Sequence, residues 1–386
     1  MNTLKVLGLM SGTSADGVDA VLVRFQGQPT RPTWTILASH FHPYPSALHE
    51  RLVAMGQGHV LSAGDVLQLA EEVTEAQAQA ARDCDRDGQA DLIGCHGQTL
   101  WHQPPRNGRR GASWQLLQGP LLAELLDRPV VFDFRSSDLA RGGHGAPLVP
   151  AADAALLGGI GGWRAVLNLG GIANLSLLPP ATGPERHAPV VGWDCGPANT
   201  LLDLAVKRFS SGRQGFDTNG DWARGGRIDE ELIHIWLQEP YFQQAPPKST
   251  GREVFGAADL AARLETMGRR QGELSAGTDP DPADALATLT AFSAAVVAQD
   301  LAASPRPVEL LVAGGGARNG FLMEQLRRRC RGLRVRPLAA LGIEEHQREA
   351  LAFALLAWWY RLSHQASWCS VTGARRTGIL GVCAVP

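Results

Sequence analysis

The segment Val190-Val191-Gly192-Trp193-Asp194-Cys195-Gly196-Pro197-Ala198-Asn199 lies near the middle of the chain. A short apolar run ends at Asp194, and a Gly-Pro turn then opens the amphipathic stretch Thr200–Val206. This order predicts a strand followed by a helix, with Asp194 at the carboxyl end of the strand. Open α/β sheets bind their ligands at that end, so Asp194 is a candidate general base. The alternative is an aspartate that merely forms the turn.

Two regions share a plan of strand, glycine loop and strand. Residues 164–178 contain two apolar runs joined by the loop Gly170–Asn174, and residues 5–25 contain two apolar runs joined by Ser11–Gly17. In each half a third strand follows, and then helices alternate with strands. The repeated order predicts an internally duplicated α/β protein whose two halves face a central cleft. We assign 1–140 and about 365–386 to the first domain, 141–364 to the second, and Arg141–Pro147 to a hinge.

Two helices are predicted from the residues at their starts. A helix over Ser62–Asp83 begins at a serine, and Asp281-Pro282 caps a long helix with proline at its first position. Apolar residues of the second helix, from Leu286 to Leu301, are spaced for one buried face.

The loop Ser11–Gly17 is rich in hydroxyls and glycines and contains Asp16. Glycine lets backbone N–H groups approach an anion, hydroxyls donate to phosphate oxygens, and a carboxylate can hold magnesium directly or through water. An ordinary Asp-Gly hairpin turn is the alternative. The density of hydroxyls favours a phosphate-binding loop.

A second glycine loop follows the predicted strand Val308–Ala313. Gly314, Gly315 and Gly316 precede a helix that is predicted to begin at Gly320. A plain turn needs only one glycine, whereas three allow close approach of a flat or phosphorylated ligand.

Three polar side chains near the ends of other predicted elements are candidate ligand contacts. Gln98 follows the strand Asp91–Cys95 and suits a hydroxylated ligand, while Arg135 follows another strand and suits a carboxylate or phosphate. A surface ion pair of Arg135 with Asp133 is the alternative. Glu349 opens the last long helix, where local reasoning favours a role in complementing the helix dipole over a role in the cleft.

Composition limits the class of protein. The 386 residues favour two domains, and the formal net charge of -2 gives no electrostatic reason to expect nucleic acid or an anionic membrane as partner. The six cysteines include no Cys-x-x-Cys pair and the chain begins with a strand-like segment, which together predict a cytoplasmic location. The apolar run Ala350–Tyr360 is too short to cross a bilayer and predicts a buried helix.

Several common motifs are absent from the sequence. It contains no Gly-Lys dipeptide, which excludes a Walker A loop, and no Gly-x-Gly-x-x-Gly or Gly-x-Ser-x-Gly. Phosphate would therefore be held by glycine hairpins in both halves. That arrangement resembles the duplicated ribonuclease-H-like fold of hexokinases, actin and heat-shock chaperone ATPases.

Eight motifs in order resemble the set found in the anhydro-N-acetylmuramic acid kinase family. They are Met10-Ser11-Gly12-Thr13-Ser14-x-Asp16-Gly17-Val18-Asp19, His96–Thr99, Asp133–Arg135, Gly145–Pro150, Asn168–Asn174, Asp194-x-Gly196-Pro197-x-Asn199, Lys248–Glu253 and Gly314–Asn319. The resemblance extends to Glu349-Ala350 and Ser370–Gly373. It implies a kinase of cell-wall recycling that uses ATP and Mg²⁺, opens a 1,6-anhydro ring and phosphorylates O6 to give N-acetylmuramic acid 6-phosphate.

The resemblance also implies roles for individual residues. Asp194 would be the catalytic base, and Gln98, Arg135 and Glu349 would contact the sugar. Metal ligands are not assigned, and a homodimer is left open. Nucleotide would be bound by Gly12, Thr13, Ser14, Ala15, Asp16, Gly17, Val18, Asp19, Gly314, Gly315 and Gly316.

The sequence departs from the family pattern at three places, and two other functions fit the same fold. Ala15 replaces a larger aliphatic residue, Cys195 replaces threonine, and Glu345–Arg348 is unlike the usual run. The alternatives are a plain sugar kinase, in which Asp194 deprotonates an existing hydroxyl, and an actin-like or chaperone-like ATPase module.

Overall fold

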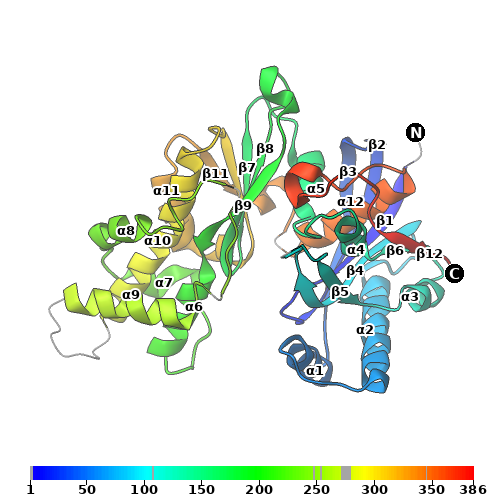
Figure 1. The fold of residues 1–386 in the computed structure, drawn as a ribbon, viewed down its shortest axis with the longest axis horizontal. Helices are drawn as coiled ribbons and strands as arrows, with labels where there is room; N and C mark the ends of the chain where they lie inside the picture. Colours follow the sequence, from blue (N-terminus) through cyan, green and yellow to red (C-terminus); the bar gives the residue numbers. More distant parts are fainter. Residues whose placement is uncertain (1–2, 107, 247, 253, 271–279, 345) are drawn as a thin grey trace. The chain divides into compact units, whose positions relative to one another are not determined.

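A computed structural model describes residues 3–106, 108–246, 248–252, 254–270, 280–344 and 346–386. The chain divides into two compact units, each built on one sheet (Figure 1). Unit 1 comprises Met1–Gly159 and His346–Pro386, and unit 2 comprises Ile160–Glu345.

Unit 1 contains a seven-stranded sheet in the order β12-β6-β4-β1-β2-β3, with β5 paired to β4. β1 is antiparallel to β2 and parallel to β4, so the first two strands form the predicted hairpin. The strands of unit 1 are β1 Leu4–Ser11, β2 Gly17–Gln28, β3 Arg31–Pro43, β4 Leu92–Gln103, β5 Ala112–Leu116, β6 Val130–Phe132 and β12 Val382–Ala384. Its helices are α1 Ser46–Gly56, α2 Ala63–Cys84, α3 Gly119–Leu126, α4 Phe134–Ala140, α5 Val149–Leu157, α12 Gln347–Arg361 and α13 Cys369–Thr372.

Unit 2 repeats this topology in a five-stranded sheet of order β11-β10-β7-β8-β9. β7, β8 and β9 form an antiparallel meander. On its other side β7 pairs with β10, which pairs with β11, and both pairs are parallel. In unit 1, β1, β4 and β6 pair in the same parallel order. The strands are β7 Arg164–Leu169, β8 Ile172–Leu178, β9 Val191–Pro197, β10 Glu309–Ala313 and β11 Arg334–Pro337. The helices are α6 Asn199–Phe209, α7 Asp221–Arg224, α8 Glu230–Leu237, α9 Ala257–Arg270, α10 Pro282–Ala302 and α11 Gly320–Arg329, with short 3₁₀ turns at Pro184–His187, Thr218–Gly220, Gly315–Arg318 and Leu338–Leu341. The shared strand order confirms the predicted duplicated, ribonuclease-H-like α/β fold.

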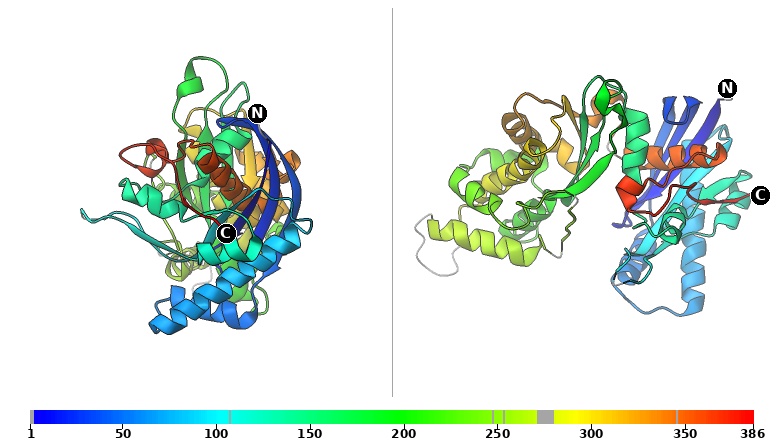
Figure 2. Two further views of the ribbon diagram at one scale, coloured as in Figure 1. Left: turned by 90° about the vertical axis from the view of Figure 1, so that its right-hand side faces the viewer. Right: turned by 45° about the horizontal axis from the view of Figure 1, so that its top comes forward.

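Helix α12 lies against β1, β2 and β4 of unit 1 (Figure 2). Its backbone comes so close to the sheet that a Cβ built on Gly8 would lie 1.9 Å from the carbonyl oxygen of Ala350. A Cβ on Gly94, which pairs with Gly8 across β1 and β4, would lie 2.3 Å from the Phe353 carbonyl oxygen. Two neighbouring glycines therefore form a shallow seat for the first turns of the helix.

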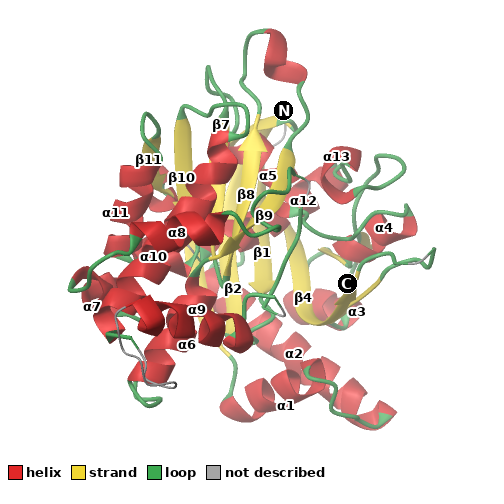
Figure 3. Cartoon of the chain, turned by 60° about the vertical axis from the view of Figure 1, so that its left-hand side comes forward, coloured by secondary structure: helices red, strands yellow, loops and turns green. Residues whose placement is uncertain are grey.

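Helix α10 forms the centre of unit 2 and contacts α11 as well as β8 and β9 (Figure 3). Asp281 caps its first turn by accepting hydrogen bonds from the N–H groups of Ala283 and Asp284, as the sequence predicted. Every residue from Ala285 to Val297 is buried, so the helix is covered on all sides and not on one face as predicted. The helix is long and apolar enough to cross a membrane by composition alone, but 83% of its most apolar window is buried inside the protein. Its apolar surface is thus used for core packing.

The boundaries of the two units differ from those predicted. The chain passes between units at 159/160 and at 345/346, so residues 141–159 and 346–364 lie in unit 1 and not in the second half. The predicted hinge Arg141–Pro147 is held inside unit 1, where the His144 N–H donates to the Thr372 carbonyl (2.8 Å) and the Gly145 N–H to Asp138 (2.8 Å). The prediction placed the boundary at the first glycine-rich stretch, whereas the packing of α5 and α12 against unit 1 decides it.

Candidate active site

The carboxylate of Asp194 accepts three hydrogen bonds within unit 2. The amide of Asn174 donates to Oδ1 (2.6 Å), while the Ser249 hydroxyl (2.8 Å) and the Thr250 N–H (3.0 Å) donate to Oδ2. The residue is partly exposed, so a carboxylate of fixed orientation stays accessible. An oriented, accessible carboxylate is what general-base catalysis requires.

Asp194 does not lie at the end of its strand. β9 continues to Pro197, and within it Asp194 stands opposite Asn174 of β8, next to a register shift in the pairing. The sequence prediction was three residues short because Gly196 and Pro197, which have the pattern of a turn, still pair with β8. The cross-strand position explains the bond from Asn174, since opposite residues on one sheet face are neighbours.

The loop that begins at Lys248 has a role that the sequence did not reveal. The Lys248 carbonyl accepts a bond from the Asp194 N–H (3.1 Å), and the buried Lys248 ammonium pairs with Asp300 of α10 (2.8 Å). Asp300 also accepts a bond from the Trp193 indole (2.9 Å). A buried ion pair thus anchors the loop that orients Asp194. Glu253, part of the same motif, lies outside the described residues.

The glycine loop Gly314–Gly316 borders a pocket in unit 2. A Cβ on Gly314 or Gly316 would lie within 2.7 Å of Asn168 or Leu169 atoms, so these two glycines are required by packing. A Cβ on Gly315 meets nothing within 4 Å and would project into open space. That space is a pocket of about 470 Å³, large enough for a nucleoside and lined by Asn199, Asp203, Phe216, Gly315, Arg318 and Asn319 among others.

The loop between β1 and β2 is shaped by bonds from neighbouring elements of unit 1. The Ala15 N–H donates to the Gly12 carbonyl (3.1 Å), and Ala15 itself is buried at φ 55°. Thr13, Ser14 and Asp16 are exposed, so their side chains and the adjacent backbone can reach a ligand. A bond of 3.0 Å from the Tyr44 N–H to the Asp16 carbonyl fixes the second half of the loop.

Gln98 braces this loop. Its amide nitrogen donates to the Gly12 carbonyl (2.9 Å) and its oxygen accepts a bond from the Ser11 hydroxyl (2.5 Å), while the residue is only 1% exposed. Gln98 also lies inside β4, which continues to Gln103 and does not end at Cys95 as predicted. In this structure both ends of the amide are therefore bonded to protein.

Asp19, Glu349 and Arg135 are brought together in unit 1. Burial, and secondarily the nearby carboxylate of Glu349, raise the pKa of Asp19 to about 7. The Oδ1 atom of Asp19 is buried and has no hydrogen-bond partner among the described residues. Burial lowers the pKa of Arg135, and the charge of Glu349 opposes that effect. Glu349 lies in the first turn of α12, as predicted, and is exposed.

His96 is a further member of this cluster, and the sequence indicated it only as the first residue of the motif His96–Thr99. Arg135 donates to its Nε2 atom (3.0 Å), so Nδ1 carries the proton and donates to the Gly97 carbonyl (2.9 Å). Burial and then the charge of Arg135 lower the pKa of His96 well below its usual value. Arg135 also donates to the Gly145 carbonyl (2.9 Å). Among the residues that the structure describes, Asp133 forms no ion pair with it. The neutral imidazole positions Arg135.

The three departures from the family pattern lie in the described residues, except for Glu345. Cys195 is fully buried beside Asp300, and burial raises the pKa of its thiol well above the ordinary value, so it acts as a small core residue. Arg348 forms a buried ion pair with Asp153 of α5 (2.5 Å), which ties α12 to unit 1. Ala15 fits the tight loop described above, and Glu345 lies outside the described residues.

A known protein family matches nearly the whole chain. The family model described as anhydro-N-acetylmuramic acid kinase matches residues 4–386. A protein of that name from Synechococcus sp. (strain CC9902) is 58% identical over 388 residues, covering 99% of this chain and 100% of its own. Another, from Parasynechococcus marenigrum (strain WH8102), is 59% identical and covers 98% of this chain and 99% of its own.

The solved structures that match this chain are much less similar to it in sequence. The activator of 2-hydroxyisocaproyl-CoA dehydratase from Clostridium difficile is 12% identical with a TM-score of 0.43, and the match covers 92% of this chain and 94% of that one. A ROK hexokinase from Thermus thermophilus is 18% identical with a TM-score of 0.35, covering 92% and 99%.

Proposed function

We propose, from the premise that the chain belongs to the anhydro-N-acetylmuramic acid kinase family, that it phosphorylates 1,6-anhydro-N-acetylmuramic acid with ATP. The products are ADP and N-acetylmuramic acid 6-phosphate, and opening of the anhydro ring by water accompanies the transfer. The reaction serves peptidoglycan recycling. Membership of a sugar-kinase family counts against an actin-like or chaperone-like ATPase module and against a kinase for an ordinary sugar.

The observation that carries this proposal is the carboxylate of Asp194, oriented by three donors and accessible. The anhydro bridge leaves no free O6 hydroxyl, so a base must activate water and not the sugar. Asp194 takes a proton from that water as its oxygen bonds to the anomeric carbon. The C1–O6 bond breaks, O6 bonds to the γ-phosphorus, and the bond to ADP breaks. Asp194 later returns the proton to solvent.

The residues present fit a nucleotide and a magnesium ion. The open face of Gly315 and the pocket beside it suit a nucleoside, and the exposed hydroxyls of Thr13 and Ser14 suit phosphate oxygens. The unpartnered Oδ1 of Asp19 suits Mg²⁺, a cation that prefers carboxylate oxygens, and the exposed carboxylate of Asp16 would be available to one of its waters. When bound, Mg²⁺ would neutralise charge on the transferred phosphoryl group.

We assign sugar recognition to the cluster of unit 1. Muramic acid carries a lactyl carboxylate, and Arg135 is the group whose planar guanidinium matches one. Its Nε and one terminal nitrogen are held by His96 and Gly145, which fixes the plane of the group. Glu349, exposed at the start of α12, is proposed to accept a bond from a sugar hydroxyl. Gln98 is proposed to act on the reaction indirectly, by bracing the phosphate-binding loop, because both ends of its amide are bonded to Ser11 and Gly12.

The small-molecule sugar is the partner that the chemistry requires. We propose a cytoplasmic location, because ATP is the phosphoryl donor.

Turnover in ¹⁸O water tests the mechanism. Attack by water at the anomeric carbon should place the label in the anomeric hydroxyl and none in the phosphate ester. The product must be analysed promptly, because reducing sugars exchange this oxygen with solvent. Label in the ester, or unlabelled product formed faster than exchange, would contradict the role of Asp194 on water. ADP release with the ring-opened sugar in place of the anhydro sugar would instead support plain kinase chemistry.

A further inference from the structure

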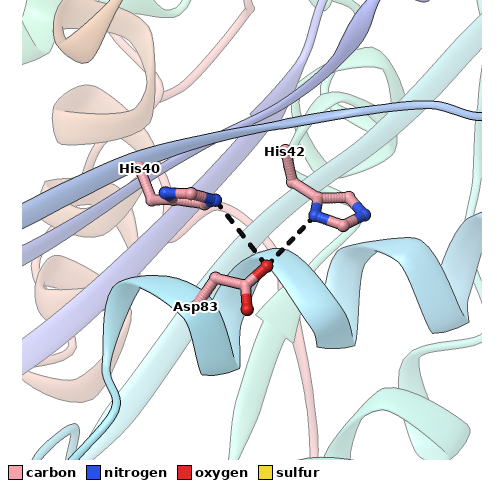
Figure 4. A group of neighbouring side chains, drawn as sticks. All are labelled: His40, His42 and Asp83. Carbon is pink, nitrogen blue, oxygen red and sulfur yellow. Dashed lines mark hydrogen bonds and ion pairs between the residues drawn. The ribbon is translucent and has the colours of Figure 1, made fainter.

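His40, His42 and Asp83 form a separate cluster in unit 1 that the proposed reaction does not use (Figure 4). The two histidines alternate along β3 and so project from the same face of the strand. Asp83 stands in the last turn of α2, which packs on β3. Two imidazoles from one strand and a carboxylate from the facing helix thus point to one place.

The separations within the cluster match those between ligands of a small metal ion. The Asp83 Oδ2 atom lies 3.1 Å from His42 Nδ1 and 3.6 Å from His40 Nε2, and all three ligand atoms lie within 4.8 Å of one another. Tetrahedral zinc with bonds of about 2.0–2.1 Å separates its ligand atoms by roughly 3.3 Å. Small side-chain movements would therefore bring all three atoms into coordination.

The carboxylate is held in a suitable orientation. Gln79, one turn earlier on α2, donates to Asp83 Oδ1 (2.9 Å) and leaves Oδ2 facing the imidazoles. The side chains of His40, His42 and Asp83 are 38%, 25% and 31% exposed, so an ion can enter from solvent. Bonds from neighbouring groups that orient a ligand typically raise its affinity for metal.

We propose that His40, His42 and Asp83 bind a divalent transition-metal ion of the zinc, cobalt or nickel class. Imidazole nitrogen selects these ions over Mg²⁺ and Ca²⁺, which prefer oxygen ligands. The three ligands leave a fourth position for water. Metal binding at His42 Nδ1 takes the place of its hydrogen bond to Asp83, and the neutral imidazole then carries its one proton at Nε2.

Such an ion would join the edge strand β3 to the end of α2. β3 leads directly to Tyr44, whose N–H bonds to the Asp16 carbonyl in the loop assigned to phosphate. The site is therefore positioned to stiffen the support of that loop.

Calorimetric titration of the full chain with ZnCl₂, without nucleotide or magnesium, tests the proposal. We expect about one ion per chain and a visible absorption band typical of four-coordinate cobalt when Co²⁺ is used instead. His42→Gln and Asp83→Asn should each weaken binding by roughly 100-fold or more, since even neighbours of metal ligands contribute 10–100-fold. His59→Gln, at an exposed histidine of the same unit, is the matched control and should bind like the parent.

Circular dichroism confirms that each variant is folded, and His40→Gln replaces any variant that is not. Absence of binding by the parent chain would overturn the proposal and leave the cluster as a histidine–aspartate hydrogen bond. Equal binding by parent and variants would overturn it as well. A thiolate-to-cobalt charge-transfer band would then place the ion at the exposed Cys369 or Cys383.

Discussion

Asp194 belongs to a strand, but its orientation depends on Ser249, which lies 55 residues further along the chain. The hydroxyl of Ser249 and the N–H of Thr250 fix one carboxylate oxygen, and Asn174 fixes the other. The fold should depend little on the negative charge of Asp194, because the amide of an asparagine at this position can make similar hydrogen bonds. The residue can therefore be tested with a nearly isosteric substitution.

Asp194→Asn should lower kcat by about 10²–10⁴-fold while folding and ATP binding stay close to those of the parent. The new amide oxygen can accept the bonds from Ser249 and Thr250, and Asn174 can turn its own amide to accept from the new nitrogen. Steady-state kinetics and denaturation curves measure the two effects. Ser249→Ala, which removes one of two donors to Oδ2, is the control and should cost much less. A variant that keeps more than about a tenth of kcat would refute the base assignment.

Asp19 should make the stability of the protein depend on pH. Its pKa is about 7 in the folded state and 3.8 in the reference state, so between these values the folded state holds the extra proton. The free energy of unfolding should then fall as pH rises from about 4 to about 7. We expect this fall to be roughly 1–2 kcal/mol once solvent screening is allowed for. Asp19→Asn should remove it.

Urea denaturation at both ends of this pH range measures the effect of Asp19→Asn. Glu349→Gln should act in the same direction but less, because Glu349 is the smaller cause of the shift. If the free energy of unfolding varied with pH in the same way for the parent and for Asp19→Asn, the pKa of Asp19 would not be raised in the folded protein.

Gly315 is the glycine of its loop that packing does not require. Gly315→Val should place a branched side chain in the pocket and weaken ATP binding by roughly tenfold or more, a loss of about 1.4 kcal/mol, with little effect on the sugar. Calorimetry with each ligand measures this. Gly161→Val, at another glycine with open space around it, controls for the loss of backbone freedom. Equal losses for ATP and sugar would mean that the loop has only a structural role.

At the scale of elements, the position of α12 depends on two sheet residues that have no side chain. Gly8 and Gly94 have no side chains, and the helix backbone occupies that space. The buried pair of Arg348 with Asp153 adds a second tie to α5. Together these contacts place Glu349, at the first turn, near Asp19 and Arg135. The position of one proposed site residue thus depends on two glycines far away in sequence.

Gly8→Ala should destabilise the protein by about 1–3 kcal/mol, because the new methyl would lie 1.9 Å from the Ala350 carbonyl oxygen and the helix must move. Denaturant unfolding measures the change. Gly56→Ala, at a helical glycine with nothing within 4 Å of the added carbon, is the control and should be neutral or slightly stabilising. A neutral Gly8→Ala would show that α12 does not depend on this contact.

At the scale of the molecule, the two units share a topology but differ in how the chain builds them. Unit 2 is continuous, and its apolar core, from Trp163 to Val335, is formed entirely by its own residues. Unit 1 is closed only when residues 346–386 return to it, since α12 covers β1, β2 and β4. The difference predicts which fragments fold.

The fragment 160–345 should fold alone and unfold cooperatively, whereas 1–159 alone should not, because the surface that α12 covers would be exposed. Coexpression of 346–386 with 1–159 should restore a soluble unit. Thermal melts followed by circular dichroism measure cooperativity. A stably folded fragment 1–159 would show that α12 is dispensable to unit 1.

Local features of the sequence determined the elements and their order. Ser62 caps α2 and Asp281 caps α10 as predicted, and the alternation of strands and helices in each half indicated the duplicated α/β fold. The residues that form these signals lie within about one turn or one strand of each other, so neighbouring positions are enough to specify them. The eight motifs also indicated the family, because each motif is a short run of neighbouring residues.

Only the tertiary structure decided which distant groups meet. The bond of Ser249 to Asp194, the assignment of 141–159 and 346–364 to unit 1, and the cluster of His40, His42 and Asp83 all depend on packing. Gln98 shows the same limit, since its pattern suited a sugar contact and its amide is bonded to the loop of Gly12. A local pattern states what a side chain can bind, but the partner is chosen by the free energy of burying whole elements against each other, to which residues throughout the chain contribute.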